Sequence, residues 1–241
     1  MSDKPIKISI ILPVYSETNS LVDTVREINN VVPSEYLYEI LIIVSPKSAS
    51  ESFDICKRLS LQYSFINWHT QQNNPGIGWA FREAFVKAKG THILMMASDG
   101  ETDPKAIPLM IKKSEETGCD IVIGNRWSRN GGFKRYNPVK FVLNYLFQSI
   151  LKTIFIPTID DYTYAYRLYK TEALKGSCWE ETKHPFLLES LLKPIKRGFS
   201  VEQVAVKWSS RNSGKPKNTF FQNFAYIRTA IRVYLKNEGA K

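Results

Sequence analysis

The sequence predicts an α/β domain whose doubly wound, mostly parallel sheet carries helices on both faces. One observation is the order of the segments: over residues 6–98, runs rich in Val, Ile and Leu alternate with amphipathic segments of helical spacing. A second is that polar loops follow the apolar runs, as they do at the carboxyl ends of parallel strands. With 241 residues and a hydrophobic content of 43%, one domain with a large core is expected.

The first predicted strand is "IKISIILPVY", residues 6–15, in which β-branched residues dominate and Pro13 lies near the end. The segment that follows places Leu21, Val25 and Ile28 at intervals of four and three, which predicts an amphipathic helix. The same alternation predicts further strands at residues 38–45, 65–71, 91–98 and 119–127.

The chain is basic. It has 33 Lys and Arg against 23 Asp and Glu, a net charge of +10 that favours an anionic partner such as a nucleotide or a phospholipid surface. The basic residues are not interleaved with a nucleic-acid-binding motif, so no nucleic-acid partner is expected. Cys56, Cys119 and Cys178 lie far apart without metal-ligand spacing, as expected of reduced thiols in the cytoplasm. The N-terminal segment "MSDKPIK" lacks the long apolar run of a signal peptide.

The polar loops that follow the predicted strands are expected to meet at one edge of the sheet, where doubly wound domains bind their ligands. These loops comprise residues 16–17, 45–47, 73–78 and 98–103. The fifth predicted strand ends in Arg126. An arginine that ends an apolar strand has little structural purpose there, which favours a functional role.

The stretch "MMASDGETDP", residues 95–104, places Asp99, Glu101 and Asp103 directly after the fourth predicted strand. Carboxylate oxygens are the ligands that hard cations prefer, and Mg²⁺ needs only one or two of them when phosphates complete its shell. Asp99 is therefore the first candidate ligand and Glu101 the second. Asp103, followed by Pro104, better fits the cap of the next helix.

Six stretches occur in the order and spacing of inverting family 2 glycosyltransferases: "ISIILPVYSETNSL", "NNPGIGWAFREAFVKAKG", "ASDGETDP", "IVIGNRW", "DYTYAYRLY" and "VKWSSRNSGKPK". Over residues 6–217 the chain most resembles the branch of dolichyl-phosphate mannosyltransferases and bacterial polyprenyl-phosphate glycosyltransferases. The resemblance implies a GT-A fold, a nucleotide-sugar donor, and Mg²⁺ or Mn²⁺ on the donor diphosphate. Two positions depart from the family pattern. Ala97 replaces the first Asp of its DxD motif, and Ser-Pro-Lys at residues 45–47 replaces its Asp-Asp.

The resemblance also implies the residues that contact the donor, with Asp99 and Glu101 holding the metal. The donor-binding candidates are Pro13, Tyr15, Glu17, Ser45, Gly78, Ser98, Arg211 and Lys215. Several alternatives stay open. Glu17 could be a first-turn acid that complements a helix dipole, and Ser45 could be an N-cap. The basic loop "RNSGKPK" could fold over the diphosphate or be a plain exposed loop.

On the other side of the reaction, the resemblance implies acceptor-binding and catalytic residues. The acceptor-binding candidates are Arg126, Arg135, Arg167 and Glu189, and the catalytic candidates are Asp99, Asp161 and Arg126. For a hydroxyl acceptor, Asp160 or Asp161 could act as general base. A phosphate acceptor is already ionised, and the same acids would then only hold their loop. Arg135 could clamp an acceptor phosphate or lie in a solvated loop, and Glu189 could be a buried partner of arginine or backbone.

Two amphipathic segments occupy the second half. Residues 138–156 carry a polar residue at every fourth position between 140 and 152, which fits an interfacial or partly buried helix better than a membrane span. Residues 219–236 separate apolar from basic side chains, a pattern typical of attachment to an anionic membrane surface. Packing on the chain's own domain is the alternative. We expect a GT-A domain at residues 1–217 and a basic amphipathic helix and tail at residues 218–241.

These observations predict a metal-dependent, inverting glycosyltransferase in the cytoplasm, with peripheral contact to the inner face of the membrane. The expected acceptor is a polyprenyl phosphate. Two alternatives remain: transfer to a sugar hydroxyl of a surface glycan, and a degenerate module that only binds a nucleotide-sugar.

Overall fold

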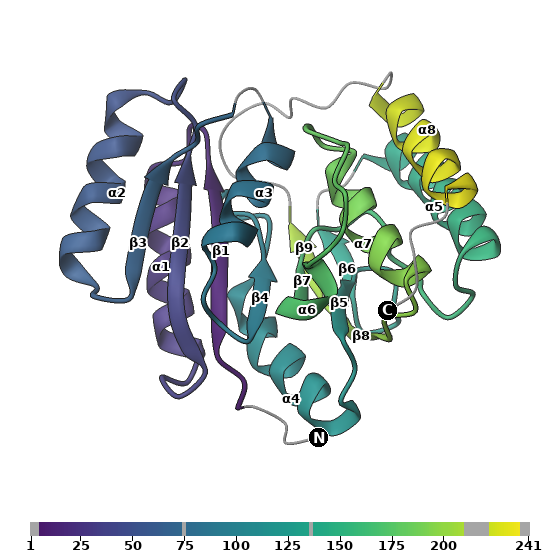
Figure 1. The fold of residues 1–241 in the computed structure, drawn as a ribbon, viewed down its shortest axis with the longest axis horizontal. Coiled ribbons are helices and arrows are strands. Elements are labelled where there is room, and N and C mark those ends of the chain that lie inside the picture. Colours follow the sequence, from purple (N-terminus) through teal and green to yellow (C-terminus); the bar gives the residue numbers. More distant parts are fainter. Residues whose placement is uncertain (1–4, 74–75, 135–136, 210–221, 237–241) are drawn as a thin grey trace.

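A seven-stranded sheet forms the centre of the molecule, with helices on both faces (Figure 1). The computed structural model describes residues 5–73, 76–134, 137–209 and 222–236. The strands are arranged in the order β3-β2-β1-β4-β7-β5-β8. All of them pair in parallel except β7, which lies antiparallel between β4 and β5. The expected doubly wound, mostly parallel α/β sheet is thus confirmed.

The strands predicted from the apolar runs correspond to the first five strands of the structure. The strands of the central sheet are β1 (Ile8–Val14), β2 (Leu37–Val44), β3 (Ile66–Thr70), β4 (His92–Met95), β5 (Ile121–Asn125), β7 (Arg167–Lys170) and β8 (Val201–Ala205). A separate parallel pair consists of β6 (Gly132–Lys134) and β9 (Lys207–Ser209).

The helices connect and cover these strands. They are α1 (Asn19–Val31), α2 (Ser50–Gln62), α3 (Ile77–Lys87), the 3₁₀ helix η1 (Pro104–Ala106), α4 (Ile107–Thr117), α5 (Pro138–Ile154), α6 (Thr171–Leu174), α7 (Phe186–Lys196) and α8 (Gln222–Leu235).

Strand order reverses beside β1. The chain runs from β1 outward to β2 and β3, and then crosses back to place β4 on the other side of β1. Such a reversal opens a crevice beyond the carboxyl ends of the two central strands. Two contacts hold the loops there: the Ser98 hydroxyl donates to the Pro13 carbonyl at 3.0 Å, and the Ser45 amide donates to the Val14 carbonyl at 2.8 Å.

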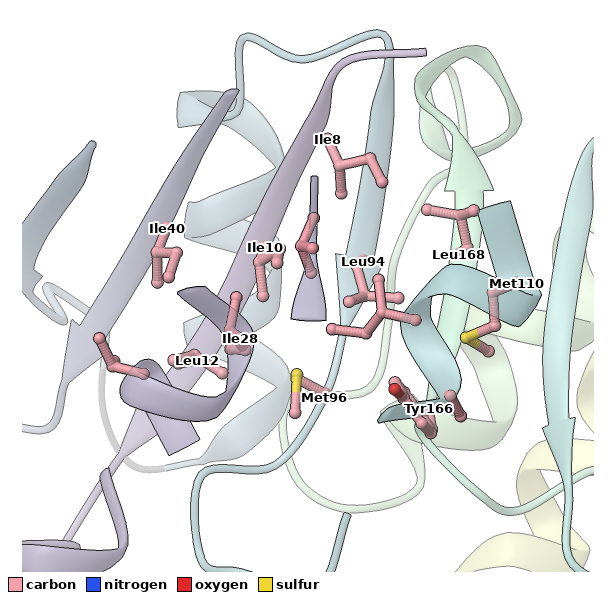
Figure 2. Packing of buried hydrophobic residues seen from close by; sticks show 14 of the residues in the cluster. Ile8, Ile10, Leu12, Ile28, Ile40, Leu94, Met96, Met110, Tyr166 and Leu168 are labelled. Atoms are coloured by element: carbon pink, nitrogen blue, oxygen red, sulfur yellow. The ribbon is translucent and has the colours of Figure 1, made fainter. Parts of the chain in front are cut away.

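Each face of the sheet has its own apolar core, because side chains alternate along a strand. On one face, Ile8, Ile10 and Leu12 of β1 pack with α1, α2 and α4. Figure 2 shows this layer, with Ile28 of α1 and Met110 of α4 against the strands. On the other face, α3 and α7 provide most of the cover. Two rigid layers therefore fix the strand ends that carry the candidate site.

The two amphipathic segments of the second half form α5 and α8. Within the described residues, neither these nor any other helix combines the length and apolar character needed to cross a bilayer. Helix α8 packs against α7, with Ala230 and Val233 buried in the second core. The boundary expected after residue 217 falls in the part of the chain that the structure does not describe.

Candidate functional site

The acidic loop after β4 is a tight turn. Asp99 is half-buried, and its Oδ1 accepts a hydrogen bond from the Glu101 amide at 3.1 Å, which brings the two acidic residues onto one turn. Asp103 lies outside this turn. It is exposed and accepts a hydrogen bond from the Lys105 amide at 3.0 Å at the start of η1. The cap interpretation of Asp103 is therefore confirmed.

The loop after β1 is closed by Glu17. Its carboxylate accepts hydrogen bonds from the amides of Tyr15 at 2.6 Å and Ser16 at 2.9 Å. The Ser45 hydroxyl, in the loop after β2, accepts a hydrogen bond from the Lys47 amide at 3.2 Å instead of capping α2, which begins at Ser50. Pro13, Tyr15, Glu17, Ser45 and Ser98 thus lie at neighbouring strand ends, as predicted, and their contacts with a donor stay a prediction.

Gly78 has a packing reason that the sequence did not reveal. A Cβ atom at Gly78 would lie 2.7 Å from the backbone carbon of Thr182 and 2.8 Å from the Cβ of Phe186. Gly76, with φ of 135°, is constrained in the same way, because its Cβ would lie 2.0 Å from the Thr182 carbonyl oxygen. The glycines let the loop before α3 pack directly on the segment before α7.

Arg126 and Asp161 form a buried, two-pronged ion pair. Nε and Nη2 of Arg126 donate to the two carboxylate oxygens at 2.7 and 2.9 Å, and the Arg126 amide donates to Oδ2 at 3.1 Å. A second layer comes from α5: Gln148 Nε2 donates to the Thr163 hydroxyl at 2.7 Å, and its Oε1 accepts the Tyr162 amide at 2.8 Å. The Thr163 hydroxyl lies 3.4 Å from Arg126 Nη2. The orientation of the Arg126 guanidinium is therefore fixed by Asp161 and Thr163, which α5 supports through Gln148.

Tyr164 joins Arg126 to the acidic loop. The guanidinium carbon of Arg126 lies 4.3 Å from the centre of the Tyr164 ring, and the Tyr164 hydroxyl donates to Thr102 Oγ1 at 3.1 Å. Burial raises the pKa of the Tyr164 phenol, so the phenol stays neutral near physiological pH. The nearby charge of Arg126 lowers the pKa of this phenol and that of Asp99 raises it, but burial is the larger effect.

A pocket of about 570 Å³ opens between the loop after β5 and the start of α5. It is lined by Arg126, Trp127, Gly132, Phe133, Pro138, Phe141 and Val142. Its walls are aromatic: the Trp127 ring lies 4.7 Å from that of Phe133 and 4.9 Å from that of Phe141. Phe133 in turn neighbours Trp208, which bridges to Thr102 of the acidic loop. The pocket therefore combines one fixed cation with apolar walls and adjoins the acidic turn.

Two of the expected acceptor-binding residues lie in the core, away from this pocket. Arg167 is fully buried, and it donates to the carbonyls of Leu187 at 2.5 Å and Tyr162 at 2.8 Å. Glu189 is also fully buried, and its carboxylate accepts the amides of Glu180 and Glu181 at 3.0 and 2.9 Å. Direct contact of either side chain with an acceptor does not fit these positions, and Glu189 follows its alternative interpretation as a buried partner of backbone.

Three further predicted residues, Arg135, Arg211 and Lys215, lie outside the described residues.

A metal would depend on the acidic turn that carries Asp99 and Glu101. In the described part of the chain, no three His, Cys, Asp or Glu side chains are grouped closely enough to hold a metal by themselves. Asp99 and Glu101 on one turn fit a hard cation that takes its other ligands from water and from the phosphates of a substrate.

Sequence reasoning missed Tyr164 and Gln148 as parts of this site. Tyr164 lies inside the "DYTYAYRLY" motif, but its partner Thr102 lies 62 residues away in the chain. The sequence therefore does not reveal their contact. In the sequence, Gln148 stands out only as part of the polar stripe of residues 138–156. The polar character of that stripe was the available signal.

Comparison with known proteins identifies the family. A family model described as glycosyl transferase family 2 matches residues 9–177. The chain belongs to this family. The strand ends described above are the edge at which its candidate site lies.

Curated relatives of the chain agree with that family assignment. A dolichol-phosphate mannosyltransferase of Pyrococcus furiosus is 25% identical over 97% of this chain and 65% of its own length. A polyprenol monophosphomannose synthase of Mycolicibacterium smegmatis is 22% identical over 86% of this chain and 79% of its own length. Glycosyltransferase AglD of Haloferax volcanii is 21% identical over 87% of this chain, which spans only 34% of AglD.

Among solved structures, the chain is similar to glucosyl-3-phosphoglycerate synthase of Mycobacterium tuberculosis in complex with Mn²⁺, UDP and phosphoglyceric acid. The TM-score is 0.69 at 15% identity, and the match covers 98% of this chain and 80% of the other. At this identity the likeness establishes the fold, which is the expected GT-A fold.

Proposed function

We propose that this glycosyltransferase moves a sugar from a nucleoside-diphosphate sugar to the phosphate of a polyprenyl phosphate, with inversion at the anomeric carbon and with the help of a divalent cation. The names of two curated relatives, a dolichol-phosphate mannosyltransferase and a polyprenol monophosphomannose synthase, support this class of acceptor. The chain spans only 34% of AglD and 65% of the mannosyltransferase.

The observation that carries the proposal is the position of Arg126 in an aromatic pocket. A guanidinium group matches phosphate oxygens, and Trp127, Phe133 and Phe141 offer apolar walls next to it. A ligand that suits both features has an anionic head and an apolar body. A polyprenyl phosphate has this character, whereas a sugar hydroxyl of a glycan has no negative charge to place beside the arginine.

The hydrogen bonds of Asp161 support a phosphate acceptor as well. Both of its carboxylate oxygens accept hydrogen bonds from Arg126, which suits a residue that positions the arginine more than one that removes a proton. A hydroxyl acceptor needs a general base, but a phosphate oxygen is already ionised near neutral pH and needs none. Asp161 is therefore proposed to act on the reaction through Arg126.

On the donor side, Asp99 and Glu101 would hold Mg²⁺ or Mn²⁺. A bound divalent cation neutralises the charge that develops on a departing nucleoside diphosphate. The chain itself would position the donor at the crevice between β1 and β4 through Pro13, Tyr15, Glu17, Ser45, Gly78 and Ser98. Arg211 and Lys215, outside the described residues, are proposed to contact the donor diphosphate. The acceptor phosphate would then attack from the side of the Arg126 pocket, opposite the leaving group.

The protein is proposed to work at the cytoplasmic face of a membrane, since a polyprenyl phosphate resides there. We propose that the chain consists of a GT-A domain, residues 1–217, and a C-terminal helix and tail, residues 218–241. Arg135, also outside the described residues, is proposed as a second cation for the acceptor phosphate.

The test is a transfer assay with purified protein and labelled UDP-, GDP- and dTDP-sugars, each with and without Mn²⁺ and added polyprenyl phosphate. The proposal expects a labelled lipid-linked product that requires both additions. Transfer that ignores the lipid phosphate and labels a glycan instead would contradict it. Calorimetry with the same nucleotide-sugars covers the remaining possibility, because donor binding without any transfer would indicate a degenerate binding module.

A further inference from the structure

We infer that α5 and α8 together form one surface that docks on a lipid bilayer through apolar side chains, not through a basic stripe. In the described part of the chain, 18 large hydrophobic side chains are exposed, and eight of them lie on α5 and five on α8. Examples are Leu146 and Ile150 on α5, and Ile227 and Ile231 on α8. The apolar exposed surface is thus concentrated on two of the helices, as expected of an interaction site.

The two helices lie side by side (Figure 1) and contact each other through aromatic rings. The rings of Phe147 and Tyr226 are 6.4 Å apart, and those of Phe155 and Tyr234 are 6.1 Å apart. In Figure 1 both helices lie at the end of the molecule away from α2 and β3. We call the exposed apolar side chains of α5 and α8 the apolar face.

Two basic side chains at the end of the segment of residues 219–236, Arg232 and Lys236, pair with acidic residues of the chain's own domain. Arg232 donates to Glu181 at 2.8 Å, and Lys236 donates to Glu180 at 2.8 Å. The Thr229 hydroxyl, on the same side of the helix, donates to Glu181 at 2.7 Å. These contacts fix α8 on its own domain. Its opposite side, with Ile227 and Ile231, is left facing outward.

Arg228 is the more exposed of the two arginines of α8. The Arg228 side chain is 74% exposed and lies 3.9 Å from Glu181. Neither α5 nor α8 contains an acidic residue, so lipid headgroups of negative charge would not be repelled. Electrostatic attraction therefore contributes, but the larger part of the contact area is apolar.

Continuity with the Arg126 pocket favours a bilayer over a second copy of the chain. Phe141 and Val142 line that pocket and are also exposed on α5, at 40% and 56%. This step rests on the proposed function: an acceptor whose apolar tail stays in the bilayer could present its phosphate at the mouth of the pocket without leaving the membrane. A protein partner that covered the apolar face would close this route.

Vesicle flotation of the full chain tests the inference without any activity measurement. The protein should float with vesicles of phosphatidylcholine alone and should do so at high salt, where electrostatic attachment is screened. Leu146→Glu and Ile231→Glu should each lower the bound fraction about tenfold, because a charge replaces an apolar side chain at the interface. Leu61→Glu on α2 and Val86→Glu on α3 are matched controls, at positions 80% and 87% exposed, and should bind like the wild type.

Several results would overturn the inference. The first is that the wild type does not bind vesicles. The second is that its binding requires anionic lipid and is lost at high salt. The third is that the control variants lose as much of the bound fraction as Leu146→Glu and Ile231→Glu. A stable dimer in light scattering that Leu146→Glu dissociates would assign the apolar face to a second copy.

Transfer to a short, water-soluble polyprenyl phosphate in the absence of vesicles separates this inference from the proposed function. If Leu146→Glu fails to bind vesicles but transfers to the soluble acceptor at the wild-type rate, both stand. Vesicle binding without transfer to any phosphate acceptor would leave docking intact and remove the proposed function. Transfer to the soluble phosphate acceptor without any vesicle binding would support the proposed function and would contradict docking on the bilayer.

Discussion

Arg126 and Asp161 make two parallel hydrogen bonds, of 2.7 and 2.9 Å, at a place where both side chains are buried. The pair ends at the pocket that carries the aromatic walls, so it fixes a single cation at the meeting point of an apolar surface and the acidic turn. A buried pair of this kind is weak evidence for stability, because removal of both charges from water is costly. Its retention in the pocket is better explained by a requirement for a positioned guanidinium.

Replacement of one or both partners tests whether the ion pair is needed for transfer as well as for stability. Asp161→Asn should destabilise the fold by about 3–5 kcal/mol, since it leaves Arg126 buried without its carboxylate. The double variant Arg126→Met/Asp161→Leu should recover most of that free energy in urea unfolding, yet should not recover transfer. Recovery of transfer in the double variant would show that the arginine is not needed.

Substitutions in the acidic loop separate metal binding from capping. Asp99→Asn should reduce the rate of transfer by at least about 100-fold, because the leaving diphosphate loses a metal ligand, and Glu101→Gln should have a smaller effect in the same direction. Asp103→Ala is the matched control, since its carboxylate caps η1. It should cost about 0.5–2 kcal/mol of stability and leave the rate unchanged. Equal rates for Asp99→Asn and Asp103→Ala would contradict the assignment.

Tyr164→Phe removes one hydroxyl between Arg126 and the acidic loop. The loss of its hydrogen bond to Thr102 should cost about 1 kcal/mol of stability and should lower kcat several-fold. Tyr166→Phe is the comparison, because the Tyr166 hydroxyl donates instead to the backbone of Asp103 at 3.1 Å. It should show a similar loss of stability with kcat preserved. Parallel changes in the two variants would mean that the Tyr164 hydroxyl acts only on stability.

His92 should make the fold sensitive to mild acid. Burial, assisted by the nearby charge of Lys170, lowers the pKa of His92 from 6.5 to about 4. The unfolded chain then binds a proton below pH 6.5 that the folded protein excludes until about pH 4, so stability falls as the pH drops through this window, by about 3 kcal/mol in total. His92→Gln should flatten this dependence when urea unfolding is compared near neutral pH and at about pH 4.5. An unchanged slope in the variant would assign the acid sensitivity to other groups.

Much of the architecture was accessible from sequence because buried parallel strands must be apolar whatever surrounds them. The run that became β1 and the spacing of Leu21, Val25 and Ile28 in α1 carry that requirement locally. The convergence of Glu17 and Asp99 at adjacent strand ends followed from topology alone.

The parts that escaped prediction depend on partners far away in the chain. The outward side of α8 is decided by Glu180 and Glu181, which lie about fifty residues earlier and take up Arg232 and Lys236. Arg167 matched a family motif, but only the surrounding carbonyls of the folded chain show that it is a core residue. Periodicity reveals that a helix has two sides, and long-range pairing decides which side faces the protein.

The central claim is that Arg126 binds the acceptor phosphate, and Arg126→Lys tests it most directly. Lysine keeps the charge but cannot make the two-pronged bond to Asp161 that fixes the cation at the pocket. KM for a polyprenyl phosphate should therefore rise about 10- to 100-fold, while calorimetry should find the affinity for the nucleotide-sugar donor unchanged. An unchanged KM for the lipid phosphate together with weakened donor binding would contradict the account and would move Arg126 to the donor side.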